Sequence, residues 1–291
     1  MSLLWREAPW GYVMVLPVFL GLAAFYYVAM VRAFGISFTR WNVLSPPRWV
    51  GLDNYAFLLT DPTLRKAVWN TTRFTLLNVP CTLIVALVLA LALNARLRLR
   101  AAYRLIYFLP VLTMPVAVSY VWKWAYSYQY GAFNLLLNAI GLPRVNWLGN
   151  VHVAMLAIAI QAVWMGMGYQ MVILLSGLQN IPRAYYEASL VDGANAWQRL
   201  LHITLPLLTP TIFFVMVTAT IGSFQQFDIV YVLTKGGPMD TTRTVVYTLY
   251  EDAFRGFIMG RATAEGWVLF VIILAFTLIQ YKVQSRWVHY E

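Results

Sequence analysis

Residues 185–210, YYEASLVDGANAWQRLLHITLPLLTP, decide the fold of this chain. This segment is polar and interrupted by a glycine, yet it lies between two long apolar stretches. Residues 183–190 are expected to form a short amphipathic helix, and residues 194–202 a second one. Gly193 separates them, because glycine tolerates the positive φ that a sharp reversal needs. The pattern predicts two short helices that project from a membrane, where a partner outside the bilayer can bind them.

The composition of the 291-residue chain places it in a lipid bilayer. Hydrophobic residues make up 61% of the sequence and charged residues 11%, whereas a soluble domain has roughly 25% charged residues. A membrane-spanning helix needs about 20 apolar residues. The sequence therefore predicts an all-α polytopic membrane protein that forms a single domain over residues 1–291. Its six predicted transmembrane helices cover residues 11–34, 72–95, 104–126, 151–177, 204–229 and 264–283, and the polar loop covers residues 178–206.

Positive charge after the second span predicts the orientation. Arg96, Arg98, Arg100 and Arg104 form a basic cluster in one short loop, and such clusters face the cytoplasm. With an even number of spans, both termini are then expected in the cytoplasm. Anionic lipid is a simpler partner for the net charge of +10 than nucleic acid. No basic run alternates with exposed aromatic residues as it does in a nucleic-acid groove.

Side chains for catalysis or metal binding do not cluster in the sequence. Cys81 is the only cysteine, so no disulfide can form within the chain, and the three histidines lack metal-ligand spacing. No GxxxxGK[ST] sequence is present, so the chain has no phosphate-binding loop and is not expected to hydrolyse ATP. We therefore expect neither an enzyme nor a metal site.

The polar loop resembles the EAA loop of bacterial ABC importer permeases. The matching positions are Glu187, Ala188, Asp192, Gly193, Ala194, Ile203, Leu205 and Pro206. Two positions depart from the family pattern, since Ser189 stands where the family mostly has Ala and Leu200 where it often has Phe. Four further segments resemble the sugar-permease branch of this family: 50–55 (VGLDNY), 146–148 (NWL), 177–182 (GLQNIP) and 233–238 (LTKGGP).

This resemblance implies a type I ABC importer of the carbohydrate-uptake kind, similar to maltose and glycerol-phosphate permeases. The chain would lie in a bacterial cytoplasmic (inner) membrane with a second homologous permease, two ABC ATPase subunits and an extracytoplasmic solute-binding protein. ATP and Mg²⁺ would bind the ATPase subunits, and this chain would need no cofactor. The EAA loop would be the coupling helix that docks into the ATPase through Glu187, Ala188, Ser189, Asp192, Gly193 and Ala194.

Two polar clusters within the spans are candidates for a sugar pathway. A sugar site needs an aromatic ring for the apolar sugar face and neutral groups that hydrogen-bond to the hydroxyls. Polar side chains are costly inside a membrane and usually face a cavity. The candidates are Trp164, Gly166, Tyr169, Ser223, Gln225 and Gln226, with Gln161, Gln170 and Asp228 near them. Helix–helix packing is the alternative for each, because small and amide side chains are ordinary contacts between membrane helices.

The sequence does not name the solute. A glycerol-phosphate-type or another small polar solute is the alternative to a sugar, although no Arg or Lys lies mid-span in the expected route to hold a phosphate. A proton-coupled secondary transporter is a weaker alternative, because it would need a carboxylate near the middle of the bilayer. Asp228 and Glu265 alone approach a span, and both are expected at its outer end.

Overall fold

The computed structural model describes residues 2–95 and 98–288, with side chains from Trp10 onward, and confirms the all-α class. In this part of the chain, strands are limited to Thr39–Arg40 (β1) and Arg48–Trp49 (β2), which pair antiparallel. Arg96 of the predicted basic cluster lies outside the described residues. The chain divides into two compact units, one of residues 2–61 and 249–268 and the other of residues 62–248 and 269–288.

A long apolar helix near the N-terminus dominates the first unit. It runs without a break through α1 (Ser2–Leu22), the π-helix η1 (Ala23–Tyr27) and α2 (Val28–Ser37). The stretch Trp10–Ser37 is long and apolar enough to cross a membrane, and none of its most apolar window is buried. Its side chains are therefore available to lipid or to another chain.

The remainder of the first unit packs closely around a polar anchor. Asn54, in α3 (Asp53–Thr60), donates from Nδ2 to the carbonyl oxygens of Ser37 at 2.8 Å and Thr39 at 2.9 Å. These bonds tie α3 to the end of α2 and to β1. Glu265 is fully buried in the second turn of α14 (Met259–Gln284).

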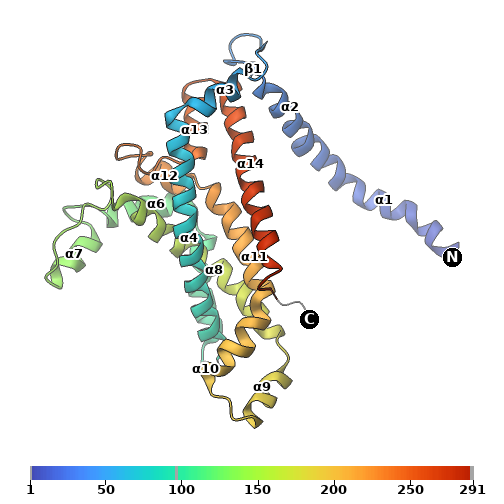
Figure 1. Cartoon of the computed structure of the whole chain (residues 1–291), viewed down its shortest axis with the longest axis vertical. Helices are drawn as coiled ribbons and strands as arrows, with labels where there is room; N and C mark the ends of the chain where they lie inside the picture. The colour runs from blue at the N-terminus through green and yellow to red at the C-terminus, as the bar shows by residue number, and fades with distance from the viewer. Residues whose placement is uncertain (1, 96–97, 289–291) are drawn as a thin grey trace. The chain divides into compact units, whose positions relative to one another are not determined.

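The second unit is a bundle of long helices with shorter ones at its ends (Figure 1). Its transmembrane helices up to the polar loop are α4 (Pro62–Asn94), α5 (Arg100–Leu112), α6 (Pro115–Ala125) and α8 (Ala154–Asn180), with the short α7 (Ala132–Ala139) before α8. After the loop come α11 (Leu205–Phe224), α12 (Asp228–Leu233) and most of α13 (Val245–Tyr250), and the C-terminal part of α14 completes the unit. The π-helix η3 (Glu251–Arg255) and the start of α14 belong to the first unit.

Small residues allow the helices of this unit to pack closely. Ala86 and Ala90 of α4 are fully buried against Leu174 of α8 and Leu208 of α11 in one apolar core. A Cβ at Gly168 would overlap the carbonyl oxygen of Tyr107, so this position requires glycine. Close approach of this kind is a common way for membrane helices to associate.

Hydrogen bonds join the N-terminal half of α4 to a segment far along the chain. Asn70 donates from Nδ2 to the carbonyl oxygens of Asp240 at 2.7 Å and Arg243 at 3.1 Å. The hydroxyl oxygen of Thr71 accepts from the backbone N–H of Val245 at 3.1 Å. Both polar side chains are buried, so these bonds satisfy groups that would otherwise lie unpaired among apolar neighbours.

The third predicted span differs most from expectation. Residues 104–126 were expected to form a single helix, but α5 and α6 meet there at an angle of 98°. Thr113 and Met114 between them are extended, with ψ of 151° and 121°. Pro115 at the start of α6 explains this, because proline excludes the preceding residue from the helical region. The described residues therefore hold five helices able to cross a membrane, or six if the bent pair counts as one span.

Candidate coupling segment and solute cavity

The polar loop folds into two short helices joined by a tight turn. The first is α9 (Arg183–Val191), and Gly193, two residues after its end, has a φ of +74°. The N–H of Gly193 donates to the carbonyl oxygen of Leu190 at 3.1 Å, and that of Ala194 to the carbonyl oxygen of Ser189 at 2.9 Å. This pair of bonds is the Schellman arrangement, which satisfies the last carbonyls of a helix.

The second short helix is capped at its start and continues into a long helix at its end. It comprises α10 (Ala196–Arg199) and the π-helix η2 (Leu200–Thr204), which continues into α11. The side chains of Asn195 and Gln198 each accept from the other's backbone N–H, at 2.9 and 2.8 Å, and form a capping box. The hydroxyls of Tyr186 and Thr204 lie 3.1 Å apart, so α9 is tied to the end of η2, directly before α11.

The six predicted docking residues fall into three groups. Glu187, Ala188 and Asp192 are exposed, and Glu187 makes no hydrogen bond or ion pair with any described residue. Ser189 is buried and its hydroxyl donates to the carbonyl oxygen of Tyr186 at 2.8 Å, so its contacts stabilise α9 itself. Gly193 and Ala194 form the turn.

Sequence reasoning missed the apolar residues that this segment exposes. Val191 is 89% exposed, Trp197 65% and Leu190 57%, although all three belong to a polar loop beyond the ends of the long helices (Figure 1). Apolar side chains that remain exposed outside a bilayer commonly mark a protein contact. The signal was visible in the sequence as large apolar residues between charged ones.

The two polar clusters meet at one cavity of about 350 Å³. The cavity is open rather than enclosed, and its walls come from α4, α5, α6, α8, α11 and the start of α12. From the predicted set it is lined by Gly166, Tyr169, Gln170, Ser223, Gln226 and Asp228. Asp228 is the one acidic residue among the described lining residues, and no Lys or Arg is among them.

Asn78 of α4 also lines this cavity and was not predicted. Its Nδ2 donates to the hydroxyl oxygen of Ser223 at 2.7 Å, which connects α4 to α11 at the cavity wall. An asparagine inside an apolar span is itself a signal, because such residues usually face a cavity or another polar group. Asn78 lies far in sequence from both predicted clusters, so the sequence did not indicate that it lines the same cavity.

Three predicted residues lie elsewhere. Trp164 packs its ring against Trp122, with centroids 5.6 Å apart, and Gln161 is buried and donates to the hydroxyl of Ser119 at 2.7 Å. Gln225 is exposed just after α11 and is not among the lining residues. For Trp164 and Gln161 the observed contacts are those of helix packing.

Known proteins share both the sequence and the arrangement of helices. Residues 79–289 match the profile of the family described as "Binding-protein-dependent transport system inner membrane component". The chain is 38% identical to the probable ABC transporter permease protein YesP of Bacillus subtilis, over 97% of this chain and 92% of that protein. It is 36% identical to the trehalose/maltose transport system permease protein MalF of Thermococcus litoralis, over 97% and 96%.

A solved structure agrees with these relatives. A chain of a bacterial alginate ABC transporter, crystallised in complex with an alginate pentasaccharide-bound periplasmic protein, superposes with a TM-score of 0.83. It is 25% identical, and the match covers 97% of this chain and 95% of that one. The chain therefore belongs to the inner-membrane permease family of binding-protein-dependent ABC transporters.

Proposed function

We propose that this permease forms one side of the pathway for a sugar or oligosaccharide in an ATP-driven importer. The observation that carries the proposal is the cavity at which Tyr169, Gln170, Ser223 and Gln226 meet. The ring of Tyr169 is 52% exposed and offers an apolar face. The amides and the hydroxyl offer neutral hydrogen-bonding groups of the kind that sugar hydroxyls use.

The charges of the cavity favour a neutral solute over a phosphate ester. No cation is present among the described lining residues, and Asp228 would repel an anion. The relative MalF is named as a permease of a trehalose/maltose transport system, and this agrees with a neutral sugar as the solute. A glycerol-phosphate-type solute would need a cation from another subunit.

The open side of the cavity calls for a second permease to complete the pathway. An external solute-binding protein would deliver the solute, as the alginate transporter's complex with its periplasmic protein suggests by analogy. This assembly would lie in a bacterial inner membrane with both termini of the chain in the cytoplasm.

Residues 178–206 would dock into the ATPase subunits, which bind ATP and Mg²⁺. The exposed Glu187 and the exposed apolar residues Val191 and Trp197 provide a mixed surface for that contact. A polar helix pair with apolar side chains on its surface suits a protein partner better than water. Tyr186 would carry the movement to α11 through its contact with Thr204.

Uptake by the reconstituted importer tests the pathway with a matched pair of variants. Gln226 lines the cavity and Gln225, its neighbour in sequence, does not. Gln226→Ala should lower solute uptake about two- to tenfold, as loss of one hydrogen bond predicts. Gln225→Ala should transport like the wild type.

The measurement is ATP-dependent accumulation of labelled sugars in proteoliposomes, with binding protein added. Both variants should assemble with the partner subunits to the same extent, as checked by co-purification. Equal uptake by Gln226→Ala, Tyr169→Ala and wild type would assign these residues to packing. Uptake of glycerol phosphate in preference to sugars would refute the neutral solute.

A further inference from the structure

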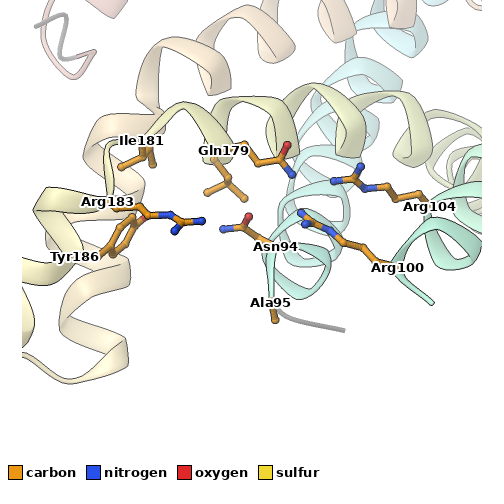
Figure 2. A pocket seen from close by; sticks show the side chains of 9 residues that line it. Asn94, Ala95, Arg100, Arg104, Gln179, Ile181, Arg183 and Tyr186 are labelled. Carbon is orange, nitrogen blue, oxygen red and sulfur yellow. The ribbon is translucent and has the colours of Figure 1, made fainter. Parts of the chain in front are cut away.

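A basic cavity of about 730 Å³ lies in the second unit where the long helices end. The end of α4, the start of α5, the end of α8 and the start of α9 form its walls. Figure 2 shows Arg183 pointing into it from one side and Arg100 and Arg104 from the other. Asn94, Gln179 and Tyr186 complete its polar lining.

The positive charge of this basic cavity is not balanced by the described residues. No Asp or Glu lines it. When the oxygen and nitrogen of the Gln179 amide are exchanged relative to Figure 2, which is the orientation that satisfies both atoms, the oxygen accepts from Nη2 of Arg100 at 2.6 Å and of Arg104 at 2.8 Å. A neutral amide satisfies two donors but neutralises no charge, and the buried Nε atoms of both arginines have no hydrogen-bond partner among the described residues.

These features call for an anion with several acceptor oxygens. A guanidinium group presents its N–H donors in a planar fork that matches a phosphate, and buried donors left unpaired are costly. Three such groups converge on a space large enough for a phosphate with a glycerol-sized substituent. Asn94 and Tyr186 could bond to the hydroxyls of that substituent.

The position of the basic cavity indicates where the phosphate comes from. Apolar helices end around it, since α4 ends at Asn94 and α8 at Asn180, so the cavity lies at the level of the lipid headgroups. Leu99, directly before α5, and Ile106 in its second turn are also exposed, and acyl chains could cover them. Basic pockets between transmembrane helices bind anionic headgroups for these reasons.

We propose that the basic cavity binds the phosphate of an anionic phospholipid, which bridges α5 to the coupling segment. Arg183 is the first residue of α9, so a phosphate held by Arg100 and Arg104 also holds the base of that helix. The role in coupling rests on the proposed function of residues 178–206, whereas the binding site does not. Lipid composition would then affect how firmly the coupling helices are positioned.

Lipid binding by the full-length chain tests the site directly. The purified chain in neutral detergent is titrated with phosphatidylglycerol or phosphatidylcholine, and bound lipid is counted by native mass spectrometry. Phosphatidylglycerol should bind more tightly than phosphatidylcholine. The double variant Arg100→Gln/Arg104→Gln should weaken phosphatidylglycerol binding at least about tenfold, as expected for lost charge-assisted bonds.

Arg98→Gln is the matched control, because Arg98 is exposed just before α5 but does not line the basic cavity. It should change the affinity by less than about twofold, as is usual for an exposed charge. Arg183→Gln provides a second test if the double variant unfolds, because Arg183 is exposed at the other wall. It should reduce phosphatidylglycerol binding while leaving the melting temperature unchanged.

Four results would overturn the proposal. Equal affinity for the two lipids, or equal losses in Arg98→Gln and the cavity variants, would mean that no specific site exists. Displacement of the lipid by an equal concentration of inorganic phosphate or glycerol phosphate would make a soluble phosphate the ligand. Loss of the bound lipid in the complete complex would mean that an acidic group of a partner protein fills the cavity. None of these measurements requires transport, so the pathway can stand if the lipid site fails.

Discussion

Gly193 is the single residue on which the geometry of the coupling segment depends most. Its φ of +74° lies in the left-handed region, and it closes the Schellman turn after α9. A Cβ placed there would meet no atom within 4 Å. The requirement for glycine is therefore a matter of backbone conformation and not of space.

Substitution at Gly193 should reflect this conformational requirement. Gly193→Val should abolish solute-stimulated ATP hydrolysis, because a β-branched residue resists positive φ and would redirect α9. Gly193→Asn should retain most of the activity, because asparagine tolerates the left-handed region. The measurement is the ATPase rate of the reconstituted complex, together with the amount of ATPase subunit that co-purifies.

The expected losses are specific to coupling, since Gly193 lies outside the long helices. Both variants should insert into the membrane and accumulate like the wild type. Full solute stimulation in Gly193→Val would show that the angle between α9 and α10 is not what transmits movement.

At the residue scale, the sequence predicted local features better than distant ones. The turn at Gly193 was predictable because a glycine that follows a short helix commonly adopts positive φ and ends the helix. The bond from Asn78 to Ser223 was not, since it joins residues 145 positions apart. A single sequence does not show which residues of two packed helices lie opposite each other.

At the scale of elements, the bend between α5 and α6 shows the limit of hydropathy. Within residues 104–126, the stretch 105–122 has no charged side chain, so composition predicts one span, while the backbone turns by 98° near Pro115. Proline inside a span was recognisable as a kink, but its size depends on the residues before it. Thr113 and Met114 are both extended, and this makes the kink nearly a right angle rather than a gentle curve.

Close packing between helices can be tested with a pair of glycines. Gly168→Ala should destabilise the protein by about 1–3 kcal/mol, because the new Cβ would meet the backbone of α5. Gly222→Ala should be neutral within about 0.5 kcal/mol, because no atom of the described chain lies within 4 Å of its Cβ. The melting temperature of each variant in detergent measures the difference.

The Gly222 variant is also a control for the general effect of adding a methyl group to a membrane helix. A melting temperature for Gly168→Ala that matches both Gly222→Ala and wild type would mean that α5 and α8 separate easily. Their packing would then contribute little to the stability of the second unit.

At the scale of the whole molecule, the orientation in the membrane is the main prediction. Met239 is 79% exposed in the turn between α12 and α13, and Asn195 is exposed between α9 and α10 at the other end of the second unit (Figure 1). The proposed topology places Met239 outside the cell and Asn195 in the cytoplasm.

Cysteine labelling of intact cells distinguishes the two sides. With Cys81→Ala as the background, Met239→Cys should react with a membrane-impermeant maleimide, and Asn195→Cys should react only after the cells are opened. Both variants should react equally in detergent, which controls for exposure. Labelling of Asn195→Cys in intact cells would reverse the topology and place the polar loop outside.

The bonds between α4 and the segment near residue 243 also have a consequence for biosynthesis. A ribosome adds about 5–20 residues per second, so Asn70 emerges roughly 9–35 s before Asp240 and Arg243, which are 170 and 173 residues later. During that interval the side-chain amide of Asn70 lacks the two carbonyl acceptors that it has in the folded protein. Until residues 240 and 243 have been synthesised, water at the bilayer surface or the insertion machinery must therefore supply hydrogen bonds to this amide.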